Sequence, residues 1–160
     1  MLYTLHKHVI PAAYSILPPY MESNRATAML LAIALQESNA SHRRQVGGPA
    51  KGFWQFERAG VLGVLNHVAT GQQARQFLMA LQYAPLTASD GVHEAIEHND
   101  ILAAGFARLL LWTLPQELPG SNELDKGWDQ YIEAWRPGKP RRDVWDEHFF
   151  RGWARVLTAV

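Results

Sequence analysis

The sequence predicts an all-α fold in a single domain. Apolar residues recur at intervals of three and four along most of the chain, and the alternating β-branched runs that indicate strands are missing. A length of 160 residues fits one domain, since domains typically contain roughly 100–200 residues. We therefore expect one domain over residues 1–160, either all-α or mainly helical with a small α+β part. The helices are expected at residues 3–16, 22–38, 56–68, 70–84, 88–98, 100–114, 122–135 and 143–158.

Helix breakers and capping residues support these boundaries in order along the chain. Pro18-Pro19 separates the first two helices, and Pro11 inside the first should kink or split it. Segments 115–120 and 137–140 contain both proline and glycine and separate the last three helices. Three of the expected helices are preceded by a residue that can cap them: Thr70 (with Gln73), Thr87 (with Asp90) and Asn99.

The segment at about 39–54 does not follow a helical pattern. It is polar and glycine-rich and ends on two aromatic residues, Phe53 and Trp54. Loops of this length in compact domains are usually functional or disordered. Because strong helices flank the segment, we expect an ordered functional loop, with a short hairpin around Gly47-Gly48.

Composition and charge exclude several classes of protein. Fifteen Lys and Arg residues balance fifteen Asp and Glu residues, so no overall field attracts nucleic acid or an anionic membrane. The longest apolar run, residues 28–35, is far shorter than the about 20 residues that span a bilayer. The first residues lack the apolar stretch of a signal peptide. We therefore expect no nucleic-acid partner, no membrane insertion and no signal peptide.

Glu37 is the residue best suited to chemistry. It continues the apolar stripe of the helix at 22–38, so its carboxyl should lie on the core side of the last turn. Burial and the negative end of the helix dipole should both raise its pKa. A carboxyl that is neutral near pH 7 can protonate a glycosidic oxygen as a general acid. The alternative is that Glu37 points to solvent or pairs with Arg43 or Arg44.

The residues around Glu37 resemble a known family. Gln36-Glu37-Ser38, the glycine-rich loop and Gly52-Phe53-Trp54-Gln55-Phe56 follow one another as in the lysozyme-like superfamily. The resemblance is closest to the lytic transglycosylases and to bacteriophage domains that degrade peptidoglycan. Those enzymes have a catalytic Glu-Ser pair at a helix end and a later Gly-Leu-Met-Gln segment, in which Phe-Trp replaces Leu-Met here. Weaker similarity at Asp100-Ile101…Gly105 and Gln130-Tyr131 extends the coverage to about residues 25–140.

This resemblance implies a lysozyme-like domain that acts on peptidoglycan glycan strands without a metal or an organic cofactor. The reaction would break the β-1,4 bond between N-acetylmuramic acid and N-acetylglucosamine, with Glu37 as general acid and then as base. The family's asparagine after the tyrosine is replaced by Ile132. The substrate-binding residues implied by the resemblance are Ser38, Phe53, Trp54, Gln55 and Tyr131.

The identity of a second carboxylate separates the possible reactions. A different type of phage lysozyme has an aspartate and a threonine where this chain has Val46 and Gly52. Their absence favours a lytic transglycosylase, which needs one acid and leaves an anhydro-sugar. Glu57 and Asp90 are the candidates for a second carboxylate in a hydrolytic muramidase (a lysozyme or endolysin) or a chitinase-like glycosidase. A third alternative is a catalytically inactive lysozyme-like module that binds glycan or builds part of a virion.

Two further sequence patterns concern metal binding and binding to other molecules. His93 and His98 are five residues apart, about 140° around a helix, so they do not match the spacing of a zinc-binding helix. The basic segment 136–142 is either a solvated loop or a contact for anionic glycan-strand peptides or other virion proteins. Without a signal peptide, we expect the protein to be made in the host cytoplasm and to act on the bacterial cell wall after release or as a virion component.

Overall fold

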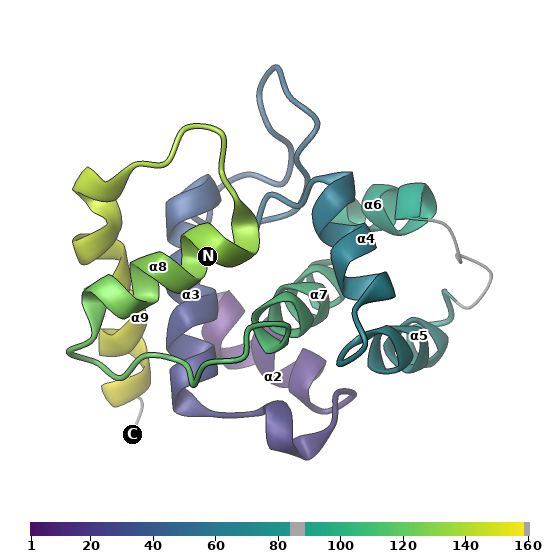
Figure 1. The fold of residues 1–160 in the computed structure, drawn as a ribbon, viewed down its shortest axis with the longest axis horizontal. Coiled ribbons are helices and arrows are strands. Elements are labelled where there is room, and N and C mark those ends of the chain that lie inside the picture. Colours follow the sequence, from purple (N-terminus) through teal and green to yellow (C-terminus); the bar gives the residue numbers. More distant parts are fainter. Residues whose placement is uncertain (84–88, 159–160) are drawn as a thin grey trace.

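The computed structural model describes residues 1–83 and 89–158, and this part of the chain is helical with no strand (Figure 1). The all-α prediction is confirmed over this range. A π-helical turn at Leu5–Val9 and 3-10 turns at Pro19–Met21 and Arg142–Val144 accompany the α-helices. The α-helices are α1 Leu2–Thr4, α2 Ile10–Tyr14, α3 Asn24–Ser38, α4 Arg58–Asn66, α5 Gly71–Ala80, α6 Ser89–His98, α7 Asp100–Trp112, α8 Leu124–Trp135 and α9 Trp145–Leu157.

The observed helices match the expected ranges closely. The first expected helix is continuous through α1, the π turn and α2, so Pro11 does not split it. Proline lacks an amide hydrogen and its ring crowds the carbonyl four residues earlier. For Pro11 that carbonyl belongs to Lys7, which lies within the wider π turn at Leu5–Val9. Three expectations lie outside the described residues: the helix end at residue 84, the helix start at residue 88 and the helix cap at Thr87.

The two predicted caps that can be tested differ. Asn99 caps α7 as expected, because its Oδ1 accepts hydrogen bonds from the amides of Ile101 and Leu102, both at 3.0 Å. The prediction for Thr70 is wrong, since its side chain makes no capping bond to α5. The buried Thr70 hydroxyl instead donates to the carbonyl of Val64 at 2.7 Å. That carbonyl lies in the last turn of α4, where it has no partner within the helix.

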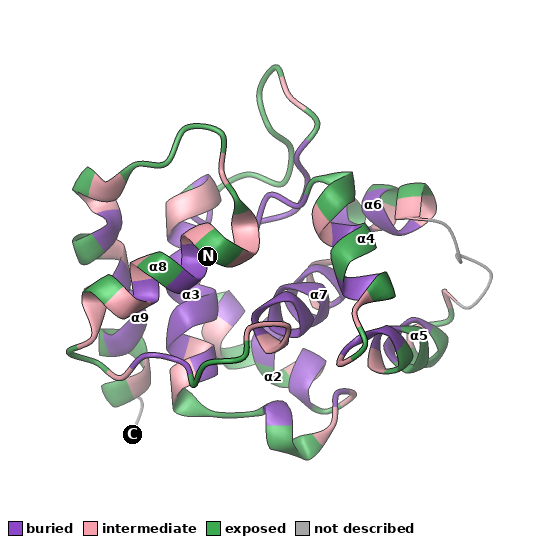
Figure 2. Cartoon of the chain, in the orientation of Figure 1, coloured by how far each residue is buried: buried purple, intermediate pink, exposed green. Residues whose placement is uncertain are grey.

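Two apolar helices, α3 and α7, form the centre of the molecule (Figure 2). Every residue from 28 to 35 in α3 and from 102 to 111 in α7 is buried. A helix that is apolar on all sides needs neighbours on all sides. Helix α7 accordingly packs against α2, α3, α4, α5, α6 and α8, while α9 packs along α3. Helices α8 and α9 lie on one side of Figure 1, and α4, α5 and α6 on the other.

Helix α9 approaches α3 closely because the residues between them are small. A Cβ atom added to Gly152 would lie 2.5 Å from the carbonyl oxygen of Ala28 and 3.1 Å from the amide nitrogen of Ala32. These neighbours are backbone atoms of a buried helix and have no room to move aside. The absence of a side chain at Gly152 therefore sets the distance between the two helices.

The loop between α3 and α4 is ordered and contains the expected short hairpin. The amide of Gln45 donates to the carbonyl of Ala50 at 3.0 Å, and Arg44 forms an antiparallel bridge with Lys51. Arg43 makes a bidentate ion pair with Asp100 at the start of α7. The buried Lys51 ammonium pairs with Glu94 and Glu97 of α6. These contacts fix the position of the aromatic segment that follows the hairpin.

None of the helices in the described part of the chain is long and apolar enough to cross a membrane.

The close packing of α9 on α3 predicts opposite effects for two glycine substitutions. Gly152→Ala should lower the free energy of unfolding by about 1–3 kcal/mol, because the added methyl overpacks the interface. Gly63→Ala is the matched control, since Gly63 is an exposed residue within α4 with no atom near an added Cβ. That variant should gain about 0.5–1 kcal/mol from reduced backbone entropy. Urea denaturation of both variants measures the difference, and equal stabilities would contradict the proposed packing constraint.

Candidate functional site

Glu37 lies in the last turn of α3, where the chain leaves the core. Asn39 ends the helix in a left-handed conformation, and the side chain of Glu37 is partly buried. The hydroxyl of Tyr131, from α8, donates a hydrogen bond to Oε1 of Glu37 at 2.5 Å. The prediction that Glu37 lies on the core side is thereby confirmed, and the structure brings together two residues that are far apart in the sequence.

Burial changes the acidity of this pair. Burial raises the pKa of Glu37 to about 7, the hydrogen bond from Tyr131 opposes that rise, and the negative charge of Glu57 adds to it. The pKa of the Tyr131 hydroxyl is also raised, first by burial and then by the neighbouring Glu37 charge. Because its pKa lies near neutrality, the Glu37 carboxyl is suited both to releasing and to accepting a proton.

The alternative ion pairs for Glu37 are wrong. Arg43 is bound to Asp100 through two hydrogen bonds, of 2.7 and 2.8 Å. Arg44 lies 3.6 Å from the carboxylate of Glu97. Both cations are directed toward α6 and α7, and within the part of the chain that the structure describes no ion pair to an arginine holds the Glu37 carboxyl in its charged form.

Tyr131 is held in place by other aromatic rings. It is buried, and its ring stacks on Trp145 of α9 with centroids 5.3 Å apart and planes 10° from parallel. Trp128 and Trp135 flank it on α8 with centroids 5.5 and 6.4 Å away. Because these rings leave little freedom of rotation, the hydroxyl of Tyr131 is directed at Glu37 by packing.

Ser38 acts on the loop rather than on a substrate. Its hydroxyl is buried and donates to the carbonyls of Phe53, at 2.7 Å, and Ala34, at 3.1 Å. A group with 2% of its surface exposed does not reach a glycan, so the expected direct contact is wrong. The hydrogen bond to Phe53 instead joins the end of α3 to the aromatic segment of the loop.

Phe53 and Trp54 belong to the core, which corrects their expected role in lining a sugar site. Both side chains are fully buried. The indole of Trp54 donates to the carbonyl of Leu30 in α3 at 2.8 Å, and one face of Phe53 is covered by the guanidinium of Arg43 at 4.4 Å. Large rings bury more apolar surface inside the molecule than they do along an open groove, so these two rings fill the space beside α3.

Gln55 likewise stabilises the loop. Its backbone has a positive φ of 48°, and its buried side-chain amide donates to the carbonyl of Gly52 at 2.9 Å. Gly52 itself has a φ of 76°, and a Cβ there would lie 2.9 Å from Ile96. Among the described residues, no hydrogen bond joins Gln55 to Glu37, and the buried amide of Gln55 is directed into the loop rather than toward the acid.

Trp135 is a residue beside the site that the sequence motifs did not single out. Its ring is half-buried, and its indole donates to the carbonyl of Trp54 at 2.8 Å. It therefore connects α8 to the loop beside the Glu37–Tyr131 pair. Its spacing of four residues from Tyr131 indicated a shared helix face, but that spacing does not distinguish a core ring from one that reaches the surface.

The two candidate second carboxylates differ in their relation to Glu37. Glu57 is exposed at the start of α4, and its charge is close enough to contribute to the raised pKa of Glu37. Asp90 is exposed and pairs with Arg58 at 3.1 Å, and it makes no contribution to the pKa of Glu37. Val46 is 95% exposed in the hairpin, so the position that carries an aspartate in some phage lysozymes points to solvent here.

The remaining sequence patterns make no hydrogen bond or ion pair to Glu37 among the described residues, although the carbonyl of Arg141 in the basic segment accepts a hydrogen bond from the neighbouring Gln36 at 2.8 Å. Nε2 of His93 is hydrogen-bonded to the carbonyl of Phe56 at 2.7 Å inside the core. No group of three His, Asp or Glu side chains suited to a metal ion occurs within residues 1–83 and 89–158. In the basic segment, Arg142 pairs with Asp125 and Asp146 and lies over the ring of Trp128.

Comparison with protein-family models, with curated proteins and with solved structures finds no significant match. The resemblance to lysozyme-like enzymes therefore depends on the motif residues alone.

The geometry predicts opposite shifts in the pKa of Glu37 for two conservative variants. Tyr131→Phe keeps the ring stacked on Trp145 but removes the hydrogen bond to the carboxylate, so the pKa of Glu37 should rise by about 1. Glu57→Gln removes a neighbouring negative charge, so the pKa should fall by a smaller amount. Carbon-detected NMR titration of the Glu37 carboxyl measures both. A shift of the same sign in the two variants would show that the assignment of neighbours is incorrect.

Proposed function

We propose that the protein cleaves the glycan strands of peptidoglycan and that Glu37 supplies the proton. The observation that carries this proposal is a partly buried carboxyl with a pKa of about 7, hydrogen-bonded to the Tyr131 hydroxyl. An acid with this pKa is suited to general acid–base catalysis at neutral pH. The motif around Glu37 supports a lysozyme-like fold, a peptidoglycan substrate and a phage lysin or virion component as the setting.

The favoured reaction is that of a lytic transglycosylase, which needs only one carboxyl group. Protonated Glu37 donates its proton to the glycosidic oxygen, the bond to the sugar carbon breaks, and positive charge develops on that sugar. The resulting Glu37 carboxylate then accepts the proton of the sugar's own 6-hydroxyl as that oxygen attacks the same carbon. The product is a 1,6-anhydro-muramic end, and no water is consumed. Tyr131 stabilises the carboxylate between the two steps by donating its hydrogen bond.

Half-buried aromatic rings beside the pair are the proposed sugar-binding surface. Trp128 and Trp135 lie on either side of Tyr131 and are both partly exposed. The apolar faces of sugar rings pack against aromatic rings of this kind. We assign to these two residues the stacking role that the sequence suggested for Trp54.

Hydrolysis is the second candidate function, and the position of Glu57 is the observation that favours it. Glu57 is exposed, and its charge is close enough to raise the pKa of Glu37. Such a carboxylate is a suitable general base for a water molecule. In that reaction, Glu37 protonates the leaving oxygen, Glu57 takes a proton from the attacking water, and the product has an ordinary reducing end.

The first test of this proposal is Glu37→Gln. Glutamine keeps the shape of the side chain but has no proton to deliver, so clearance of a peptidoglycan suspension should fall by about 10²–10⁴-fold. Glu57→Gln and Asp90→Asn serve as matched controls and should lose much less activity under the one-acid mechanism. Glycan pull-down with the same preparations should remain unchanged. A folded Glu37→Gln protein that clears cell walls at the wild-type rate would remove Glu37 from the mechanism.

The pH dependence of stability provides a second readout for the same variant. Folded Glu37 binds its proton more tightly than the unfolded chain does, because its pKa rises from 4.5 to about 7 on folding. Wild-type stability should therefore decline as pH rises through this window, by roughly 3 kcal/mol at most. Glu37→Gln lacks this decline, so its stability advantage over the wild type should grow between these pH values and then level off. A constant difference across the window would contradict the raised pKa.

Product analysis separates the candidate reactions. Mass spectrometry of muropeptides released from purified peptidoglycan should show 1,6-anhydro-muramic ends, which are lighter by one water than hydrolytic products. Products with only reducing ends, lost in Glu57→Gln, would favour the hydrolytic mechanism. No released product together with retained glycan binding would favour a binding module.

A further inference from the structure

Arg108 is a cation buried in the centre of an apolar helix. It lies within the buried run of α7 and is 3% exposed. Its Nε donates to the carbonyl of Met21 at 2.7 Å, but its buried Nη1 has no hydrogen-bond partner. No carboxylate among the described residues forms an ion pair with it, although eleven other ion pairs are present there.

An arrangement of this kind is costly unless an anion completes it. A buried charge without a partner of opposite charge destabilises a protein, because it has lost its hydration. Burial lowers the pKa of Arg108, but a guanidinium remains protonated in proteins. Unlike a buried carboxyl, it has no neutral form to adopt near pH 7. The missing partner therefore points to a ligand.

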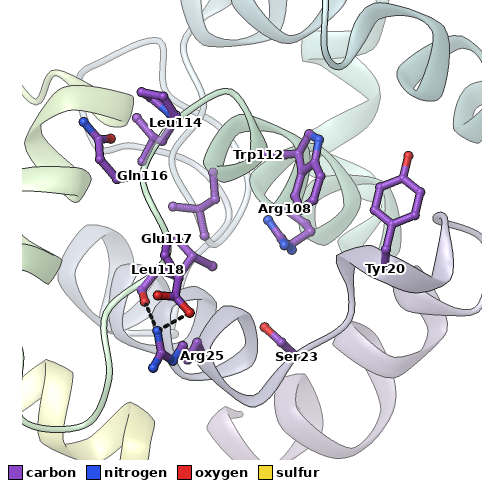
Figure 3. Close-up of a pocket in the computed structure, with 11 residues that line it drawn as sticks. Tyr20, Ser23, Arg25, Arg108, Trp112, Leu114, Gln116, Glu117 and Leu118 are labelled. Atoms are coloured by element: carbon purple, nitrogen blue, oxygen red, sulfur yellow. Dashed lines mark hydrogen bonds and ion pairs between the residues drawn. The ribbon is translucent and has the colours of Figure 1, made fainter.

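Arg108 lines a cavity of about 500 Å³ (Figure 3). Figure 3 shows its guanidinium between an aromatic wall, made by Tyr20 and Trp112, and the pair formed by Arg25 and Glu117. The rings of Tyr20 and Trp112 are 5.3 Å apart, and the Arg108 guanidinium lies 5.1 Å from the Trp112 ring. Cavities of about 300–1,000 Å³ commonly hold small ligands.

The charges of the cavity limit the class of ligand. The carboxylate of Glu117 is already bound to Arg25 at 2.7 Å, so these two charges balance each other. Among the described residues that line the cavity, Arg108 is left as the one charge without an opposite charge bound to it, and a single positive charge matches a monoanion. Hydrogen bonds from a charged guanidinium to carboxylate oxygens are stronger than those to neutral acceptors, and the aromatic wall provides apolar surface for the rest of the ligand.

We propose that this cavity binds a small organic carboxylate whose acid group pairs with Arg108 and whose planar apolar body packs against Tyr20 and Trp112. The site is separate from Glu37, because Arg25 and Glu37 lie at opposite ends of α3, about 18 Å apart along the helix axis. Binding here does not depend on the proposed glycan cleavage.

Three aryl carboxylates and their neutral amides test the proposal on the full chain. The probes are benzoate, phenylacetate and indole-3-acetate, each paired with the corresponding amide. At least one acid should bind saturably and shift the NMR signals of the Arg108 Nε–H and the Trp112 indole. Its amide should bind at least about tenfold more weakly, since it lacks the charge. Saturable binding of inorganic phosphate that is as tight as that of the acids would overturn the choice of a carboxylate.

Variants of the cavity show where the acid binds and separate a loss of binding from a loss of folding. Arg108→Met should weaken the best acid by at least about tenfold, whereas Arg151→Met, an exposed arginine on α9, should leave it unchanged. Tyr20→Ala provides an independent test, because Tyr20 is 60% exposed and its loss should not disturb folding. That variant should weaken both acid and amide. Glu37→Gln should bind the acids as the wild type does, so that failure of the proposed function leaves this result intact.

Two outcomes would refute the site. The first is no saturable binding by any of the three acids. The second is binding that is equal for acid and amide and unchanged in both Arg108→Met and Tyr20→Ala. Arg108 would then serve only to hold the carbonyl of Met21.

Discussion

The complete burial of α3 is the constraint on which the rest of this structure depends. Its residues 28–35 carry apolar side chains on every face, so each face needs a partner. Helix α7 packs on α3 from one direction and α9 from another, with Gly152 in contact with the α3 backbone. Because neighbouring elements also pack around the last turn of α3, the side chain of Glu37 lies in a poorly solvated environment. The raised pKa of its carboxyl is a consequence of how the core is packed.

A second set of contacts holds the loop and Tyr131 in fixed positions around Glu37. Trp54 links the loop to α3 through the carbonyl of Leu30, and Trp135 links α8 to the loop through the carbonyl of Trp54. Tyr131 lies between these links and Trp145, with its hydroxyl on Glu37. Buried aromatic rings with few rotamers hold a hydroxyl more accurately than a flexible chain does. The loop and α8 therefore support the acid although most of their rings do not reach the surface.

The same physical effect acts on opposite charges in two parts of the core, Glu37 in the last turn of α3 and Arg108 within α7. Burial disfavours the charged form of any ionisable group, so it raises the pKa of Glu37 and lowers that of Arg108. Glu37 relieves the cost by binding a proton near neutral pH, which makes it suitable for proton transfer. Arg108 does not lose its proton in that range and needs an anion instead. One apolar core thus underlies both proposals, proton transfer by Glu37 and the binding of an anion beside Arg108.

Most of the fold was predictable from local sequence because helix formation depends on neighbouring residues. Apolar periodicity and the breakers located the helices, Asn99 marked the start of α7, and the glycine-rich segment indicated the ordered hairpin. The core-facing position of Glu37 followed from the same periodicity. Arg108 was not singled out in the apolar run of α7, because a sequence does not show whether a carboxylate folds against a charged residue.

The sequence by itself determined which segments are helical and which acid lies on a core-facing stripe. Only the tertiary structure decided which aromatic rings are buried, where the amide of Gln55 and the hydroxyl of Ser38 donate, and that Tyr131 reaches Glu37. The physical reason is that periodicity specifies the direction of a side chain relative to its own helix. Its solvation and its partners are set by elements that arrive from distant parts of the chain, as α8 and α9 do around the end of α3.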